Sequence, residues 1–294
     1  MALVALAACG DAPSATLETP FDAGALGDAS SPTSTDASLD ALHDAGGDAA
    51  TSEPSEAGPP SCASMPLCDD FEHDAPGTAP SGWVVAMGCN PNTTDAPADG
   101  GGLVVGIDGT QHHSGNNSVR VVGGDSCGYY IVHTTAFASL NSDVFTRFWV
   151  MFSGSPTANH NGFLSMATSA GDHLRLGFQD DVVAWNAQNS DATLPDMAPQ
   201  GTSESIATSP QTWQCVEFHL EATTGHLQFW LDGQLVPGLG YDGGNVQGVD
   251  DQWSRGAPSP MVPKSLGLGW LGLNDQQTAW FDDVAVGYAR IGCD

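Results

Sequence analysis

Charged, amide, imidazole and indole side chains alternate with apolar residues in three segments of the chain. The segments are "TRFWVMF" at 146–152, "LRLGFQ" at 174–179 and "QCVEFHLEATTGHLQFWLDG" at 214–233. A period of two predicts strands with one apolar face against a core and one polar face outside it. We expect one sheet to gather on its polar face Arg147, Trp149, Arg175, Glu217, His219, Gln228 and Trp230.

The third segment predicts a hairpin whose register follows from its apolar residues. Placing the apolar residues of both strands on one face sets Glu217 beside Trp230 and His219 beside Gln228. A slip of one residue would break this match. Rings that offer apolar area, next to side chains that form directional hydrogen bonds, are typical of sheets that bind sugars.

The same face offers groups for a β-elimination on a uronic acid. This reaction needs a cation that neutralises the substrate carboxylate and a base that removes the neighbouring proton. The candidate catalytic residues are Arg147, assisted by Gln228, with His219 as the base and His160 in "NHNGF" as a second candidate base. The candidate substrate contacts are Trp149, Arg175, Glu217 and Trp230.

Each of these residues also has a structural interpretation. Trp149 and Trp230 can equally pack under a loop, and Arg147 can form an ion pair with Glu217. His219 can be a surface residue. No tyrosine, which could also serve as the catalytic acid or base, falls on the predicted hairpin. A hydrolase would need two carboxylates across a cleft, but the glucanase strand pattern E-x-D-x-x-E is absent, as are Ser-His-Asp, P-loop and HExxH motifs.

The composition limits the partners and divides the chain. With 35 acidic and 6 basic residues the formal charge is -29, which opposes binding to nucleic acids or anionic membranes. Residues 10–60 are rich in Asp, Ala, Ser, Thr and Pro, so we expect a disordered linker. Short segments punctuated by Gly, Asn, Asp and Pro fill 61–294 and predict an all-β sandwich or barrel.

Residues 1–9 form an apolar segment ending in Leu-Ala-Ala-Cys, which resembles a bacterial lipobox with Cys9 as the lipidated residue. No Lys or Arg precedes the apolar run. We therefore expect an exported lipoprotein of the cell envelope that touches a membrane only through its anchor. A plain secretory signal, giving a secreted protein, and a buried N-terminal strand are the alternatives.

Six cysteines besides Cys9 are an even number in an exported chain and predict disulfides. No CxxC pair is present, so zinc is not expected. Many connectivities are open, and the one we favour joins Cys62 with Cys68, Cys89 with Cys127, and Cys215 with Cys293.

Three separated segments together resemble a known family: "CDDFE" at 68–72, "HHSGNNSVRV" at 112–121 and "WFDDVAVG" at 280–287. In this order they resemble polysaccharide-lyase-like jelly rolls of the concanavalin A-like lectin and glucanase superfamily, which include relatives of glucuronan lyase. The resemblance implies a jelly-roll β-sandwich over roughly 66–293. It also implies a structural Ca²⁺ ion held by Glu72, Ser114, Asn117 and Asp282, with Asp283 as an alternative to Asp282.

We therefore expect an exported, calcium-stabilised jelly roll, monomeric, that acts on a polysaccharide by β-elimination. Two alternatives remain open, because one fold hosts many functions. The first is a non-catalytic, carbohydrate-binding surface lipoprotein. The second is a structural surface protein without a sugar ligand.

Overall fold

The computed structural model describes residues 62–88, 104–123, 128–140, 143–156, 160–179, 182–197, 205–272 and 276–293. One compact unit spans Ser55–Asp294. The expected signal segment 1–9, including Cys9, and the expected linker 10–60 lie outside the described residues, as do Cys89 and Cys127. Within the described part of the chain, no helix is long and apolar enough to cross a membrane.

The first of two antiparallel sheets, sheet A, has the strand order β13-β12-β11-β6-β15-β4-β3, with β1 paired to β15. Its strands are β1 (Leu67–Asp69), β3 (Val105–Asp108), β4 (Ser118–Val122), β6 (Val144–Phe152), β11 (Gln214–Leu220), β12 (Leu227–Leu231), β13 (Gln234–Leu235) and β15 (Thr278–Gly287). The first and last strands are therefore neighbours.

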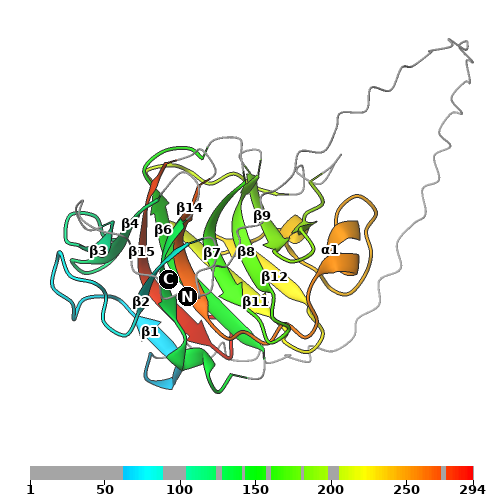
Figure 1. Ribbon diagram of the computed structural model, residues 1–294, viewed down its shortest axis with the longest axis horizontal. Helices are drawn as coiled ribbons and strands as arrows, with labels where there is room; N and C mark the ends of the chain where they lie inside the picture. The colour runs from blue at the N-terminus through cyan, green and yellow to red at the C-terminus, as the bar shows by residue number, and fades with distance from the viewer. Residues whose placement is uncertain are drawn as a thin grey trace, which may run out of the picture. The chain divides into compact units, whose positions relative to one another are not determined.

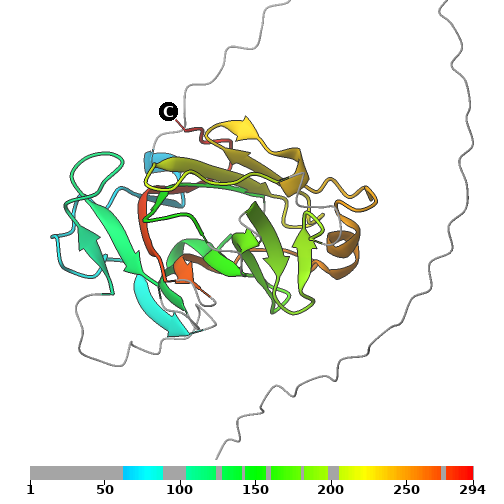
Figure 2. The same cartoon turned by 90° about the horizontal axis from the view of Figure 1, so that it is seen from above.

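The second sheet, sheet B, has the order β10-β9-β8-β7-β14-β5-β2. Its strands are β2 (Val84–Gly88), β5 (Gly128–His133), β7 (Asn161–Ala167), β8 (His173–Gln179), β9 (Val182–Ala187), β10 (Ala192–Leu194) and β14 (Leu266–Leu271). Figures 1 and 2 show the two sheets stacked as layers of a sandwich, so the expected all-β jelly-roll architecture is confirmed. The remaining elements are short: η1 (Cys62–Ser64), η2 (Thr135–Phe137), η4 (Pro237–Leu239) and α1 (Asp251–Gly256).

The core lies between the sheets and is built from the alternating apolar residues of both. Phe148 and Phe218 from sheet A and Phe163 from sheet B are at most 1% exposed. Phe148 and Phe163 meet in a T-shaped contact with ring centroids 6.4 Å apart. Burying rings of this size supplies most of the driving force that holds the layers together.

The predicted hairpin register is confirmed by the pairing of β11 with β12. Glu217 lies opposite Trp230, and His219 lies opposite Gln228. The neighbouring strand β6 continues this row on the other side of β11, with Arg147 opposite Glu217. The polar residues of these strands therefore share the outer face of sheet A, which points away from sheet B.

Two of the predicted disulfides are present in the described residues. Cys62 is bonded to Cys68 with a Cα–Cα distance of 5.3 Å, and Cys215 is bonded to Cys293 with a Cα–Cα distance of 5.8 Å. The second bond ties the C-terminal segment 288–293 to β11 on the outer face of sheet A. Figure 2 shows this dark red segment on the side of sheet A that faces away from sheet B.

Candidate functional site

A pocket of about 210 Å³ lies on the outer face of sheet B, over β7, β8, β9 and β10. A cross-strand row crosses it, in which Ser165 pairs with Arg175, Arg175 with Asn186, and Asn186 with Thr193. Partners in one row project from the same side of a sheet. The pocket is lined by His160, Asn161, Gly162, Arg175, Gly177, Phe178, Gln179, Ala184, Trp185, Asn186, Asp191, Thr193 and Leu271.

Small residues form the floor next to this row. Gly162 pairs with Gly177, and Gly177 pairs with Ala184, so three adjacent strands present almost no side chain there. A Cβ atom on Gly177 would lie 1.7 Å from the carbonyl oxygen of Asn161, so the close strand approach requires glycine. The polar row therefore borders an open floor on which a flat ring can lie.

Arg175 is the cation of the pocket. Burial lowers the pKa of its guanidinium, and the nearby Tyr130, Asp172 and Asp191 oppose that shift. A guanidinium remains charged at neutral pH and presents a planar donor set that matches a carboxylate. The pocket can therefore bind an anionic group at Arg175.

Two further titratable groups flank Arg175. His173, two residues away on β8, has its Nδ1 atom 3.2 Å from the Ser165 hydroxyl. Its pKa is lowered, first by burial and then by the charge of Arg175, so the imidazole stays neutral to lower pH. Tyr130 on β5 donates its hydroxyl hydrogen to the Gly162 carbonyl at 3.5 Å, and burial raises the pKa of this phenol.

The expected grouping of seven residues on one sheet is wrong for Arg175. It lies on β8 in sheet B, whereas the other six residues lie on β6, β11 and β12 in sheet A. The alternation of Arg175 with Leu174 and Leu176 gave the correct face of its strand but could not say which sheet the strand joins. The structure brings Arg175 together with His160, because both line the pocket on sheet B.

The outer face of sheet A is covered at one end by the C-terminal segment. Glu217 is 0% exposed and accepts hydrogen bonds from the backbone N–H groups of Ile291 (2.7 Å) and Gly292 (3.3 Å). The Arg290 guanidinium lies 3.4 Å from the same carboxylate and stacks over Trp230 at 4.8 Å from the ring centroid. Glu217 and Trp230 are therefore packing residues in this structure.

A loop covers the other end of this face. The His113 ring stacks on Trp149 with centroids 3.6 Å apart, and its Nδ1 atom is 2.7 Å from Asp283. Trp149 was expected either to contact a sugar or to pack under a loop, and in the structure it packs under a loop. His219 stacks on Phe145 with centroids 4.1 Å apart.

Arg147 lies between these two covers. The sequence also allowed Arg147 to form an ion pair with Glu217. In the structure Glu217 instead forms its ion pair with Arg290. Burial lowers the pKa of Arg147, and the charges of Asp283, Glu217 and Asp282 oppose this. Its Nε atom is buried without a hydrogen-bond partner within the described part of the chain.

Two carboxylates, one from the turn after β1 and one from β15, hold the turn of residues 113–117 from two sides. Asp282 accepts hydrogen bonds from the backbone of His113 (2.8 Å) and Ser114 (3.2 Å). Glu72 accepts the backbone N–H groups of Asn116 and Asn117, both at 2.7 Å. We call this arrangement the clasp.

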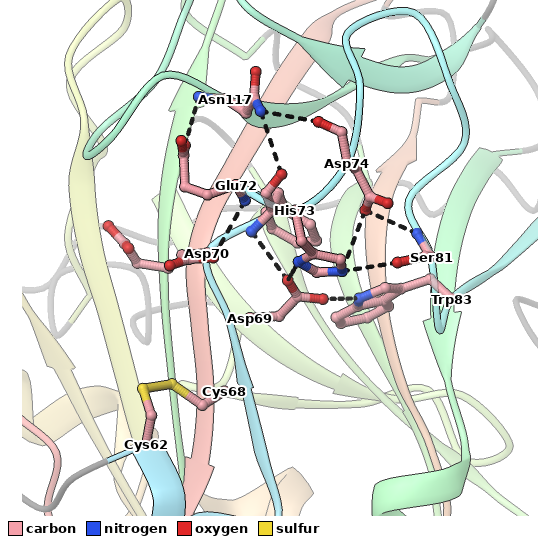
Figure 3. Close-up of polar contacts among 12 residues, drawn as sticks. Cys62, Cys68, Asp69, Asp70, Glu72, His73, Asp74, Ser81, Trp83 and Asn117 are labelled. Atoms are coloured by element: carbon pink, nitrogen blue, oxygen red, sulfur yellow. Dashed lines mark hydrogen bonds and ion pairs between the residues drawn. A yellow bond between two sulfur atoms is a disulfide. The ribbon is translucent and has the colours of Figure 1, made fainter.

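Figure 3 shows how the acids near Glu72 divide. Glu72 faces Asn117, whereas Asp69 faces His73 and Trp83. The Asn117 amide donates to the carbonyl oxygens of Phe71 and Asp74. Of the three acids in "CDDFE", only Glu72 therefore belongs to the clasp.

The backbone at the clasp is shaped for this contact. Asp283 lies within a β-bulge of β15, between Asp282 and Ala285, and has φ 48°; Gly115 has φ 58°. A Cβ atom on Gly115 would lie 2.4 Å from the Glu72 carboxyl carbon, so the turn can approach Glu72 only as glycine. Asp282 is 0% exposed, and burial together with the neighbouring Asp283 raises its pKa to about 7.

The two stacked sheets define an antiparallel β-sandwich with a polar pocket on the outer face of sheet B. Residues 83–289 match the family model described as "Polysacc_lyase-like: Cip1-like, core domain". The solved structure of "Cellulose induced protein, Cip1" is 32% identical, with a TM-score of 0.65, and the match covers 78% of this chain and 100% of that chain. The chain therefore belongs to the Cip1-like polysaccharide-lyase-like family.

Other comparisons are more distant. The structure titled "Binding domain of Botulinum Neurotoxin DC in complex with SialylT" is 9% identical, with a TM-score of 0.44, and the match covers 76% of this chain and 48% of that chain. A search among curated proteins gave no match. The disulfides and the relationship to Cip1 indicate an extracellular protein.

Proposed function

We propose that the protein is a polyuronate lyase whose site is the pocket on sheet B. One observation carries the proposal: Arg175 stands in a cross-strand row beside a glycine and alanine floor, with His160 at the same pocket. A uronic acid offers a carboxylate to the guanidinium and a ring face to the floor. This is the chemistry that the sequence favoured, moved from Arg147 and His219 to Arg175 and His160.

The elimination follows from these positions. Arg175 binds the uronate carboxylate and makes the hydrogen on the adjacent carbon, C5, more acidic. His160 removes this proton, the electrons of the C–H bond form the C4–C5 double bond, and the bond from C4 to the glycosidic oxygen breaks. The protonated His160 then gives its proton to the leaving oxygen.

Neighbouring groups position Arg175. Tyr130 and His173 are both uncharged at neutral pH, because burial raises the pKa of the phenol and lowers the pKa of the imidazole. They therefore place no second cation beside the guanidinium and no anion that would compete with the substrate for it. Gln179 and Asn186 line the pocket and supply amide hydrogen bonds to sugar hydroxyls.

Incubation with glucuronan, alginate and other polyuronates tests this function through the ultraviolet absorbance of the unsaturated product. Arg175→Gln and His160→Gln should each strongly lower the activity. His219→Gln is the matched control on sheet A and should retain activity. A flat trace of the unaltered protein on every polyuronate would end the lyase proposal.

A non-catalytic carbohydrate-binding role is the second candidate, and Tyr130 favours it. Jelly-roll lyases of this type commonly use a tyrosine as acid or base, but here the phenol is 2% exposed and its pKa is raised. Affinity electrophoresis on the same polymers separates the two functions. Retarded migration without any unsaturated product would make the protein a binding module.

We also propose that the clasp binds a structural Ca²⁺ ion. The carboxylates of Glu72 and Asp282 both bind the turn that carries Ser114 and Asn117. Carboxylate, hydroxyl and amide oxygens are the donors that calcium prefers, which supports this assignment. The buried Asp282 beside Asp283 is a pair of like charges that a divalent cation would neutralise. The ion would supply this charge compensation and fasten the last strand, β15, to the turn.

For the chain outside the described residues, we propose a lipid anchor at Cys9 and a tether over 10–60 that holds a monomeric domain away from the membrane. The lipobox-like residues ending in Cys9 support this. Labelling with a radioactive fatty acid should mark the full chain and fail on Cys9→Ser. Release of an unlabelled protein into the medium would instead favour the secreted form.

A further inference from the structure

A second pocket, of about 340 Å³, lies at the edge of sheet A, where β12 and β13 meet the segment 236–250. It is on the opposite sheet from Arg175, and the proposed lyase chemistry does not use it. Its volume is at the lower end of the range for small-molecule sites. The lining residues are Glu221, His226, Leu227, Gln228, Leu235, Pro237, Gly240, Tyr241, Asp242, Val246, Val249 and Asp250.

The walls are apolar and open to solvent. Leu235 is 52% exposed and Val246 is 57% exposed, and both line this pocket. Covering such exposed apolar side chains with the apolar face of a ligand is favourable, because it removes their surface from water. The described residues include three other exposed large hydrophobic side chains, at Val84, Ile206 and Tyr288, and none of them lines this pocket.

The polar groups of the pocket are predominantly acidic. Glu221, Asp242 and Asp250 line it, and no Lys or Arg is among its described lining residues. His226 is paired with Glu221 at 3.2 Å. Asp250 is 4% exposed, and its pKa is raised first by burial and then by the charges of neighbouring aspartates, which include Asp242 of this pocket. A cation is therefore favoured here and an anion is opposed.

The pocket is preformed. Tyr241 is bound to the edge of β12 by two backbone hydrogen bonds with Leu227, each 2.8 Å long. The Tyr241 ring meets the His226 ring edge-on at 6.4 Å between centroids. Asp242 accepts the backbone N–H of Gly244 at 2.9 Å through one oxygen, Oδ1, so its carboxylate is held in place. A ligand would bind without ordering this wall first, which favours affinity.

We propose that this pocket binds an amine-bearing sugar, such as one hexosamine unit of a cationic polysaccharide. The ammonium group binds at Asp242 and Glu221. The C–H face of the ring packs against Leu235 and Val246, and the exposed amide of Gln228 binds a ring hydroxyl. The protein would then hold a cationic polymer on sheet A and a polyanion on sheet B.

Titration calorimetry at low salt with the glucosamine trimer and with the N-acetylglucosamine trimer tests this. The deacetylated trimer should bind roughly tenfold more tightly, because a charge-assisted hydrogen bond is lost on acetylation. Added salt should weaken binding of the deacetylated trimer alone. Hexylamine, which has the ammonium group without a sugar ring, should bind more weakly than the trimer.

Two pairs of variants locate the site. Asp242→Asn and Val246→Ser should each weaken binding of the deacetylated trimer, whereas Asp70→Asn and Val84→Ser should not. The controls are matched, because Asp70 is also an exposed aspartate that accepts one backbone N–H two residues ahead, and Val84 is also an exposed valine. None of the four should alter cleavage or binding of polyuronates, so failure here is distinguishable from failure of the lyase proposal.

Three results would overturn the assignment. The first is equal affinity for the acetylated and deacetylated trimers. The second is binding that survives both Asp242→Asn and Val246→Ser. The third is no heat of binding at millimolar trimer. Equal affinity for hexylamine would retain a cation site but reject the sugar.

Discussion

The outer faces of the two sheets carry similar side chains but differ in what lies over them. On sheet A, His113 stacks on Trp149 and the C-terminal segment covers Glu217 and Trp230. On sheet B, the row through Arg175 borders an open pocket. An arginine, a histidine and an indole on a strand thus become packing residues or site residues according to the segment that crosses them.

The difference lies in where the ends of the chain are fastened. The Cys215–Cys293 bond and the buried Glu217 carboxylate draw the C-terminal segment onto sheet A. The clasp fixes the turn that carries His113 on the same face. No such fastening crosses the described part of the row on sheet B, which borders the pocket instead.

The largest effect should come from removing the guanidinium on the open face. Arg175→Gln should lower polyuronate cleavage or binding by about 100-fold, because a bidentate charged contact is lost. Arg147→Gln is the same substitution on the covered face and should stay within about twofold of the unaltered protein. Kinetics or calorimetry on both variants, with circular dichroism as the folding check, decides the matter. A larger loss in Arg147→Gln would reverse the assignment of the two faces.

The two disulfides should differ in their contribution to stability. A disulfide that closes a longer loop removes more entropy from the unfolded chain. Cys215 and Cys293 are 78 residues apart, so replacing both with serine should cost about 4 kcal/mol of unfolding free energy. Cys62 and Cys68 are 6 residues apart, and replacing them should cost about 2 kcal/mol. Urea unfolding measures both. Only the first replacement should also increase iodide quenching of Trp230 fluorescence. Unchanged quenching would show that the bond does not hold the cover in place.

The clasp gives a pH dependence with a definite sign. The pKa of Asp282 is raised from 3.8 to about 7, so between these values the folded protein holds a proton that the unfolded chain has lost. In the presence of a chelator, so without metal, the free energy of unfolding should therefore fall as pH rises through this window. Bound Ca²⁺ should remove the fall and raise the melting temperature.

Melting curves with chelator and with calcium, from pH 4 to pH 7, test the clasp. Asp282→Asn is the control, because an amide does not titrate in this range. The slope should become clearly shallower in this variant, and what remains belongs to other groups such as Asp250. Identical slopes in the variant and the unaltered protein, with no metal found by elemental analysis, would exclude both the titration and the calcium site.

The smallest effect should come from Arg290, which completes the cover over Trp230. Its side chain is 49% exposed, so solvent screens its ion pair with Glu217. Arg290→Gln should cost about 1 kcal/mol or less in urea unfolding, including the contact with the indole ring. A loss of several kcal/mol would mean that this one side chain, rather than the disulfide, holds the segment on sheet A.

Much of the fold could be predicted from alternation. The apolar residues of "TRFWVMF" and of the hairpin set the buried faces of β6, β11 and β12 and the register of β11 with β12, and Glu217 does lie opposite Trp230. The candidate site was predicted only in part. Arg175 and His160 were named, but alternation is a local property and could not place β8 on sheet B.

Tyr130 was missed as a neighbour of Arg175 for the same reason, whereas His173 was missed although it lies on the same strand. Tyr130 is 45 positions away in the chain and reaches the site only through the order of β5, β14 and β7 in sheet B. His173 shares a strand face with Arg175, at a spacing of two. That spacing in "HLRL" was the signal that could have identified His173.

The sequence by itself determined the all-β class, the buried faces of β6, β8, β11 and β12 and the register of the hairpin, because each depends on spacing. The favoured cysteine pairing and the family resemblance also named two disulfides that are present and the side chains around the clasp. The tertiary structure decided which polar face is covered and which is open. That outcome depends on strand order and on where the C-terminal segment is tied, and both arise from contacts between residues far apart in the chain. A side chain facing outward becomes a site residue only if no other part of the protein buries it first.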